Sequence, residues 1–231
     1  MTRDASSPWM LYGATGYTGT LIAREAVSRG IRPVLAGRNG GKVQSLAGEL
    51  DCPFRVFDLA SVADCARQLD GVAAVLHCAG PFSETSAPMV EACLATGTHY
   101  LDITGEIEVI EWISRQHDRG CAASISLLPA VGMDVVPTDC LAATLAAALP
   151  EAIRLEWAFA AGQALGPGTA KTVWKQMGRG GRIRRGGQIE RVPVAWKTMQ
   201  VPFPRGPRWA MTIPWGDVAS AYHTTRIPHI E

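Results

Sequence analysis

The hydrophobic pattern of the first 130 residues alternates between two kinds of segment. Short apolar runs bounded by turn residues predict strands, and apolar positions that recur every three or four residues predict helices. The predicted strands are residues 9–12, 32–37, 54–59, 73–80, 98–103 and 122–128. The predicted helices are residues 20–29, 42–50, 61–71, 88–96 and 106–119. Because strand and helix alternate without a break, we expect an α/β domain with a doubly wound parallel sheet over residues 1–130.

The pattern changes after residue 130. Alanine-rich residues 141–149 predict a helix, residues 153–160 alternate as in a strand, and residues 168–177 predict another helix. Gly186 and Gly187 separate two short alternating runs, which indicates a hairpin, and prolines punctuate further strands at 196–204 and 208–213. We therefore expect an α+β second domain over residues 131–231, for a substrate or for dimerisation. The chain stops at IPHIE within an apparent strand, so we expect an incomplete second domain and a fragment of a longer protein.

Composition narrows the class of protein. The chain has 231 residues, 47% of them hydrophobic, and a net charge of +1, which gives no global field toward nucleic acid or an anionic membrane. The six cysteines form no CxxC pair and no cluster with metal-ligand spacing. The N-terminus lacks an apolar signal core and no apolar run is long enough to span a bilayer. We expect a cytoplasmic protein without a metal, a nucleic-acid partner or a membrane segment.

A glycine-rich stretch, YGATGYTG, joins the first predicted strand to the first helix. Bare backbone before a helix N-terminus makes an anion site, because the first helical N–H groups lack partners and the helix dipole favours negative charge. Here one glycine permits the tight turn, the next lets a pyrophosphate approach, and the third lets the helix pack closely. The predicted cofactor-binding residues of this loop are Gly13, Ala14, Thr15, Gly16, Tyr17, Thr18 and Gly19.

The ends of the next strands select the cofactor. An NAD site offers an acid after the second strand, but this chain has Arg38 there, which suits a 2′-phosphate and favours NADP. Asp58, after the third strand, either meets the adenine edge or caps the following segment. Ala79, Gly80 and Pro81, after the fourth strand, are predicted to pass along the nicotinamide ribose, since ligands of such sheets lie beyond the strand C-termini.

The motifs GATGYTG, LAGRN, HCAGPF, THYLDITGE and VGMDVVPTD occur here in the order seen in saccharopine dehydrogenase-like oxidoreductases, which the chain resembles over nearly its whole length. The tail, including PWGDVASAYHTTRIPHIE, resembles the second domain of the uncharacterised bacterial members. The resemblance implies a Rossmann-like NADP-binding domain followed by a substrate domain. Relatives include trans-acting enoyl reductases, which reduce carbon–carbon double bonds of lipid intermediates. Family members are usually longer, which agrees with the expected truncation.

Residues for proton transfer are less clearly indicated. No tyrosine has a lysine four residues later, so the Tyr-x-x-x-Lys site of short-chain reductases is absent. The acid and hydroxyl candidates near the ends of the later strands are Asp102, Thr104, Glu106 and Asp134. Thr104 and Glu106 alternatively cap a helix, and Asp134 alternatively fixes the turn into the second domain. His77 is expected to be a core histidine.

These observations favour an NADP-dependent oxidoreductase that transfers a hydride to or from a C=O, C=N or C=C bond of a small or lipid-like substrate. Two alternatives stay open: a non-catalytic NADP-binding sensor, and an inactive truncated paralogue. The basic run Arg179, Arg182, Arg184 and Arg185 fits either an anionic substrate tail or a solvated hairpin. Tryptophans Trp174, Trp196, Trp209 and Trp215 are expected in a core or a homodimer interface.

Overall fold

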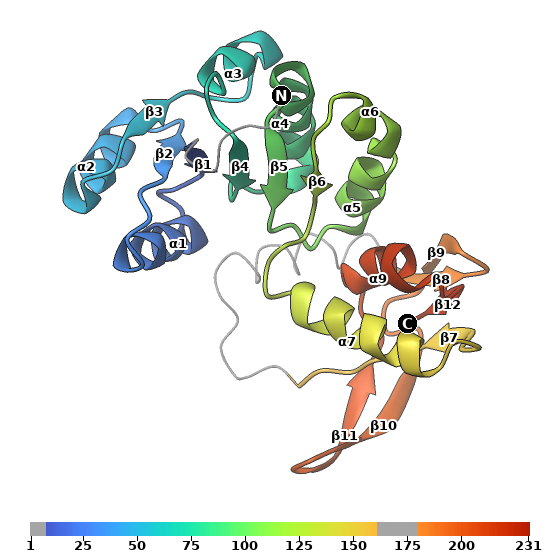
Figure 1. Ribbon diagram of the computed structural model, residues 1–231. Coiled ribbons are helices and arrows are strands. Elements are labelled where there is room, and N and C mark those ends of the chain that lie inside the picture. The colour runs from blue at the N-terminus through green and yellow to red at the C-terminus, as the bar shows by residue number, and fades with distance from the viewer. Residues whose placement is uncertain (1–7, 161–179) are drawn as a thin grey trace. The chain divides into compact units, whose positions relative to one another are not determined.

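The computed structural model describes residues 8–160 and 180–231; the predicted helix at 168–177, with Trp174 and Arg179, lies outside these ranges. Two compact units divide the chain. The first contains residues up to Thr104 together with Glu108–Gly132, and the second contains Gly105–Ile107 with Met133–Glu231. Each unit has its own sheets (Figure 1).

The first unit is built on a six-stranded sheet in the order β3-β2-β1-β4-β5-β6. Its strands are β1 Trp9–Tyr12, β2 Val34–Gly37, β3 Phe54–Val56, β4 Ala74–His77, β5 His99–Asp102 and β6 Leu127–Leu128. Every neighbouring pair is parallel. The predicted doubly wound parallel sheet is therefore confirmed, and the order reverses direction at β1 and β4, where such folds form their ligand crevice.

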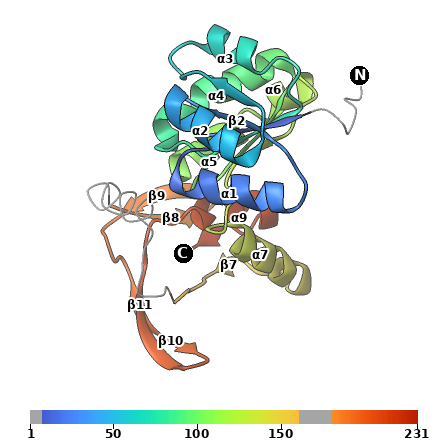
Figure 2. The same cartoon turned by 90° about the vertical axis from the view of Figure 1, so that its left-hand side faces the viewer.

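Helices connect these strands and cover both faces of the sheet. They are α1 Tyr17–Ser28, α2 Gly40–Leu50, α3 Val62–Gln68, α4 Phe82–Thr96, α5 Ile107–Ser114 and α6 His117–Ala122. One core cluster joins α1 and α2 to the sheet, with Leu11, Ala23 and Leu46 among its buried members. A second cluster packs α3, α4 and α5 on the sheet around Met10 and Tyr100. Figure 2 views this unit from the side of α1 and α2.

Several predicted boundaries in this unit were wrong, and three of them differ most from the structure. Helix α4 begins at Phe82 rather than Pro88, because the carbonyl of Pro81 already accepts the amide of Glu84 at 3.1 Å, and Pro88 lies inside the helix. The predicted helix 106–119 is two helices, since the Gln116 side-chain amide binds the Trp112 carbonyl at 3.1 Å where the chain turns. The predicted strand 122–128 shrinks to the two residues of β6 that pair with β5.

Within residues 133–160 and 180–231, the second unit contains a four-stranded and a two-stranded sheet, with two helices. Its elements are α7 Val136–Ala148, β7 Arg154–Leu155, β8 Gly181–Arg185, β9 Gln188–Val192, β10 Thr198–Phe203, β11 Gly206–Met211, α9 Asp217–Thr225 and β12 His229–Ile230. The four-stranded sheet has the order β7-β12-β8-β9. Helix α7 packs against α9, and in both cartoon views the β10–β11 hairpin extends away from the larger sheet (Figures 1 and 2).

The expected hairpin is confirmed, and a second one is found. Strands β8 and β9 pair antiparallel around Gly186 and Gly187, and β10 pairs with β11. The expected helix at 141–149 starts earlier, at Val136, because Pro137 fits the first turn, where its missing N–H costs nothing. The expected strand 153–160 is reduced to β7, since its neighbour β12 offers only two partner residues. Helix α9 was not predicted.

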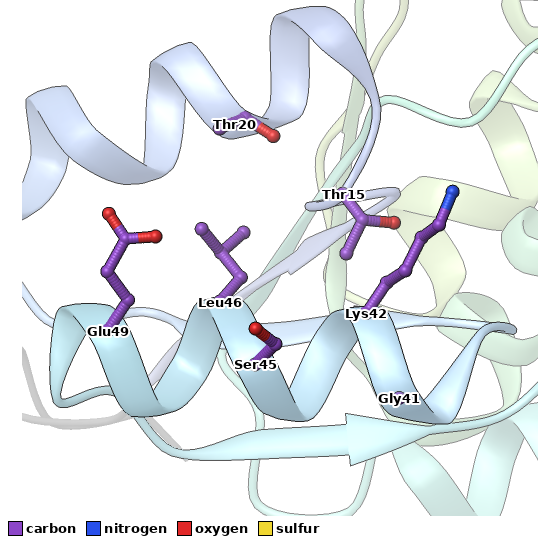
Figure 3. A pocket seen from close by; sticks show the side chains of 7 residues that line it. All are labelled: Thr15, Thr20, Gly41, Lys42, Ser45, Leu46 and Glu49. Atoms are coloured by element: carbon purple, nitrogen blue, oxygen red, sulfur yellow. The ribbon is translucent and has the colours of Figure 1, made fainter.

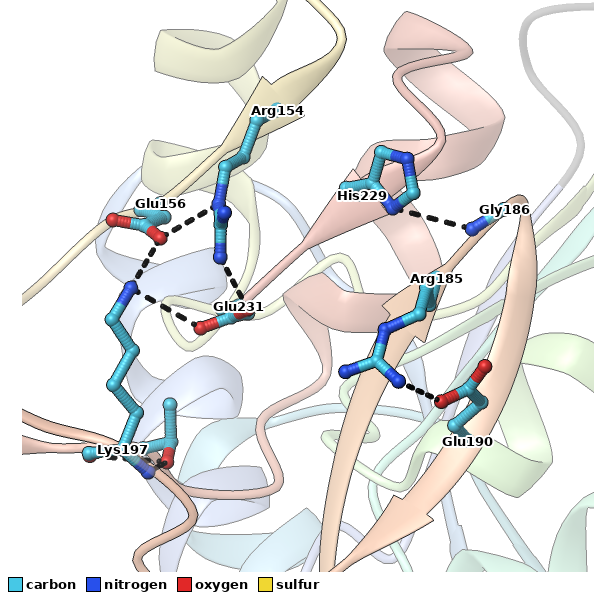
Figure 4. Close-up of polar contacts among 9 residues, drawn as sticks. Arg154, Glu156, Arg185, Gly186, Glu190, Lys197, His229 and Glu231 are labelled. Atoms are coloured by element: carbon cyan, nitrogen blue, oxygen red, sulfur yellow. Dashed lines mark hydrogen bonds and ion pairs between the residues drawn. The ribbon is translucent and has the colours of Figure 1, made fainter.

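Ion pairs bind the base of the β10–β11 hairpin to the larger sheet. Lys197 lies 2.6 Å from a carboxylate oxygen of Glu156 and 3.5 Å from one of Glu231. Arg154 on β7 pairs with the same two acids at 2.8 and 2.7 Å (Figure 4). Arg185 of the basic run pairs with Glu190 across the β8–β9 hairpin at 2.9 Å. These cations are thus engaged within the unit.

Candidate cofactor site

The glycine loop lies at the C-terminal end of β1, against β2 and β4. The amides of Gly13 and Ala14 both donate to the Ala36 carbonyl on β2, at 2.8 and 3.1 Å. Gly13 has a φ of 83°, and a Cβ there would lie 2.9 Å from the backbone nitrogen of Ala79. Both the left-handed conformation and the close approach require glycine at this position. The loop is therefore held tightly against the neighbouring strands.

The other two glycines let helix α1 start directly on the loop. Gly16 is the N-cap residue, and its amide donates to the Gly13 carbonyl at 3.0 Å. A Cβ at Gly19 would lie 2.2 Å from the Gly13 carbonyl oxygen, so no larger residue fits there without a shift of the backbone. The result is a cradle of bare backbone at a helix N-terminus, which is the geometry that binds a pyrophosphate.

Arg38 and Asp58 follow β2 and β3 at the same edge of the sheet. Arg38 is exposed and comes directly before Asn39, whose side-chain oxygen caps α2 by accepting the Lys42 amide at 3.1 Å. One carboxylate oxygen of Asp58 accepts the amide of Ala60 at 3.0 Å. This contact supports the local capping role for Asp58, one of the two roles left open by its position in the sequence.

The segment after β4 is fixed by Thr85. The Thr85 hydroxyl donates to the carbonyls of Ala79 and Pro81, at 2.7 and 3.0 Å, and lies 3.0 Å from Nε2 of His77. His77 is fully buried, and burial lowers its pKa to about 3, so it is a neutral core residue as expected. Residues 79–81 are thereby positioned as a rigid turn beside the glycine loop, whose Gly13 they contact.

Asp102, at the end of β5, is a structural carboxylate. It is fully buried, accepts the Tyr100 hydroxyl at 2.7 Å, and accepts the amides of Thr104 and Ala130 at 2.9 and 2.8 Å. Its charge also raises the pKa of Tyr100, after the larger effect of burial. These contacts tie the chain after β5 to the chain after β6. Thr104 is likewise buried, at 1% exposure.

Two of the catalytic candidates, Glu106 and Asp134, belong to the second unit. Glu106 is half-buried. Asp134 as a whole is exposed, but partial burial of its carboxyl group raises the pKa of that carboxyl. Its backbone carbonyl accepts the Trp215 indole N–H at 3.0 Å. Asp134 therefore both anchors the turn before α7 and carries a carboxyl that is more easily protonated than usual.

Sequence reasoning missed two features. A groove of about 320 Å³ between α1 and α2 is lined by Thr15, Thr20, Gly41, Lys42, Ser45, Leu46 and Glu49 (Figure 3). Lys42 lies at the Thr15 end of this groove; its spacing from Arg38 was the available signal. In the second unit, Asp217 is buried at the start of α9 and accepts the Thr138 hydroxyl, and burial raises its pKa to about 6.

Neither a metal site nor a membrane-spanning helix is found within residues 8–160 and 180–231. No group of three or more His, Cys, Asp or Glu side chains is arranged to hold a metal ion. None of the helices in this part of the chain has the length and hydropathy to cross a bilayer.

Comparison with known proteins adds to this geometry. Residues 9–128 match the family model of the saccharopine dehydrogenase NADP-binding domain. A trans-acting enoyl reductase of Mycobacterium leprae is 33% identical over 138 residues, which are 56% of this chain and 33% of that protein. A saccharopine dehydrogenase-like oxidoreductase of Homo sapiens is 25% identical over 150 residues, 56% of this chain and 35% of that protein. The matched part thus spans about a third of these relatives.

A solved structure agrees in fold over nearly the whole chain. The apo form of saccharopine dehydrogenase (L-Glu forming) from Saccharomyces cerevisiae superposes with a TM-score of 0.66 at 13% identity. The superposition covers 97% of this chain and 53% of that one. At this identity the likeness extends to the fold alone.

Proposed function

Because this chain belongs to the family of the saccharopine dehydrogenase NADP-binding domain, we propose that it acts as an NADP-dependent oxidoreductase. The observation that carries the proposal is the glycine cradle at the end of β1, where Gly13 and Gly19 leave no room for a Cβ. In this proposal the substrate is a small or lipid-like molecule with a C=O, C=N or C=C bond, and the cofactor supplies or accepts the hydride.

The residues of the first unit fit this cofactor. Backbone amides at the start of α1 would hold the pyrophosphate, and Gly16 would allow it to approach. Arg38 would hold the 2′-phosphate, and the rigid turn at residues 79–81 would border the nicotinamide ribose. No acid follows β2, where an NAD site would offer one to a ribose hydroxyl. Asp58, engaged with Ala60, would contribute to the adenine site at most through its second carboxylate oxygen.

For the proton, we propose Asp134. Asp102 and Thr104 are buried within the first unit. Asp134, by contrast, is an exposed residue, and the pKa of its carboxyl is raised. A carboxyl whose pKa is raised above its usual value is a better general acid at physiological pH. Glu106 remains the second candidate in this proposal.

Titration with the two reduced dinucleotides tests the cofactor. The intrinsic fluorescence of NADPH and of NADH would be followed on the purified chain and on Arg38→Ala. We expect tighter binding of NADPH than of NADH, and a smaller preference for NADPH in the variant. Equal affinities in the unaltered chain would contradict the NADP assignment, and binding of neither would contradict the cofactor site.

A non-catalytic NADP sensor is the second candidate, and the burial of Asp102 and Thr104 favours it, because buried side chains are less accessible for proton transfer to a substrate. Oxidation of NADPH with a panel of ketones, imines and enoyl thioesters separates the two functions. Turnover with any acceptor would exclude the sensor.

Two further expectations belong to this proposal. The six cysteines are free thiols, which supports a cytoplasmic setting.

Trp209 on the β10–β11 hairpin is 76% exposed, which supports a homodimer that covers it. Light scattering on the purified chain would measure the mass in solution, and a monomeric mass at micromolar concentration would contradict the dimer.

A further inference from the structure

One face of α2 borders the groove beside the glycine loop. Lys42, Ser45 and Glu49 follow one another at spacings of three and four residues, so they share a face of the helix. All three line the groove, and Thr15 of the glycine loop lines it from the other side. Lys42 and Thr15 lie at one end and Glu49 at the other (Figure 3).

The cations between residues 24 and 67 differ in what they contact. Arg24 pairs with Glu49 at 2.8 Å, Arg29 with Glu25 at 2.7 Å, and Arg32 with Asp51 at 3.4 Å. Arg67 pairs with Asp64, and Arg55 donates to the carbonyls of Gln68 and Asp70. Within the described part of the chain, Arg38 and Lys42 are the cations between residues 24 and 67 that have neither an acidic nor a carbonyl partner.

We propose that Lys42 is a second cation for the 2′-phosphate of the dinucleotide and that it determines, together with Arg38, the preference for NADP over NAD. This inference rests on the proposed function, because it presupposes that a dinucleotide binds at the glycine loop. A 2′-phosphate is a monoester with close to two negative charges at neutral pH. Two cations four residues apart at the start of one helix match that charge, and an ammonium group and a guanidinium supply separate donors.

The rest of the groove agrees with this placement. The carboxylate of Glu49 occupies the far end, where it would repel a phosphate dianion, and it is held there by Arg24. At the near end the backbone amide of Lys42 is already used by the Asn39 cap. The side-chain ammonium is therefore the group that Lys42 offers a ligand. The Thr15 hydroxyl borders the same end and provides a further donor.

The test compares variants in which one or both of these charges are removed. Fluorescence titrations with NADPH and with NADH would be made on the unaltered chain, Lys42→Met, Arg38→Met and the double variant. Arg29→Met, which removes an exposed charge at the far end of α1, is the control. Competition by 2′-AMP and by 5′-AMP separates phosphate at the 2′ position from phosphate binding elsewhere.

We expect Lys42→Met to weaken NADPH and 2′-AMP binding about tenfold and to leave NADH and 5′-AMP binding within twofold. The double variant should bind NADPH no better than NADH, and Arg29→Met should behave as the unaltered chain does. If Lys42→Met binds NADPH normally while Arg38→Met does not, the inference is overturned and the proposed function stands. An equal loss of NADPH and NADH would also overturn it. Binding of neither dinucleotide by the unaltered chain would overturn both.

Discussion

The Tyr100 hydroxyl donates a 2.7 Å hydrogen bond to the carboxylate of Asp102, two residues later on the same strand. The two side chains share a face of β5 because side chains on a strand alternate. The other carboxylate oxygen accepts two backbone amides, from Thr104 and Ala130. Asp102 is thus the acceptor on which the chain after β5 and the chain after β6 converge.

Replacement of Asp102 should therefore destabilise the protein. In Asp102→Ala, three buried donors lose their acceptor, and we expect a loss of about 3 kcal/mol in the free energy of unfolding, since each unsatisfied donor costs about 1–3 kcal/mol. Tyr100→Phe, which removes one donor and leaves the carboxylate in place, should cost about 1 kcal/mol. Urea unfolding measures both. An Asp102→Ala chain that is as stable as the unaltered one but inactive would instead point to a chemical role.

Replacement of Gly19 should disrupt the cofactor cradle. The Cβ of Gly19→Ala would meet the Gly13 carbonyl at 2.2 Å, so the loop and the start of α1 must separate. We expect a loss of about 2 kcal/mol in stability and at least a tenfold loss of NADPH affinity. Gly48→Ala is the matched control, because Gly48 lies in helix α2, where the added Cβ would meet no atom within 4 Å beyond its chain neighbours and the helix's own backbone. It should be neutral or stabilising by up to about 1 kcal/mol; equal effects of the two variants would contradict the steric argument.

Asp217 should make stability depend on pH in an unusual direction. Burial, with smaller contributions from Asp139 and Asp134, raises its pKa from 3.8 to about 6, against the hydrogen bond from Thr138. At a pH between 3.8 and about 6, the folded state therefore binds more protons than the unfolded state. The contribution of Asp217 is thus fully present below about pH 4 and is lost as the pH rises through 6, by roughly 3 kcal/mol in total.

Asp217→Asn removes this dependence. Its free energy of unfolding, relative to the unaltered chain, should rise by about 2 kcal/mol between pH 4.5 and 7.5. Glu151→Gln, at an exposed position in the same unit, serves as the control and should show no such trend. Urea titrations at four pH values measure the difference. A difference that stays constant with pH would show that Asp217 is ionised in the folded state throughout.

Asp134→Asn tests the proposed proton donor. If an acceptor for NADPH is found, we expect kcat to fall by about a hundredfold or more, while the Kd for NADPH stays the same. Glu106→Gln should have a much smaller effect on kcat. A normal kcat in Asp134→Asn would contradict the role as proton donor. Asp134 would then have only its structural role in the turn before α7, where its carbonyl accepts the Trp215 indole N–H.

The strands and the order of elements in the first unit could be predicted because each strand is short, apolar and followed by a turn signal. Boundaries failed where tertiary contacts decide them. Pro88 reads as a helix start, yet the turn is already formed at Pro81 by the Glu84 amide. The strand at 153–160 alternates well, but its length is set by β12, more than seventy residues away in sequence.

The site shows the same division. The glycine loop and Arg38 could be recognised because their chemistry is carried by residue type and by position after a strand. Lys42 was missed, since its relevance depends on which face of α2 turns toward Thr15. The burial of Asp102 could not be predicted either, because its partner Ala130 follows a different strand. The burial of Asp217 could not be predicted because its partner Thr138 lies on another helix, 79 residues away in sequence.

The position of β12 has a kinetic consequence. His229 and Ile230 form the strand between β7 and β8, so two strands that precede β12 in the chain are joined only through residues made some seventy-five positions after β7. Such distant pairings make folding slow, because the loop entropy is lost before the contacts form. During translation, the first unit can complete its sheet while the exposed edges of β7 and β8 still await their common neighbour. That interval is when the nascent chain is most open to binding by chaperones or to misassembly.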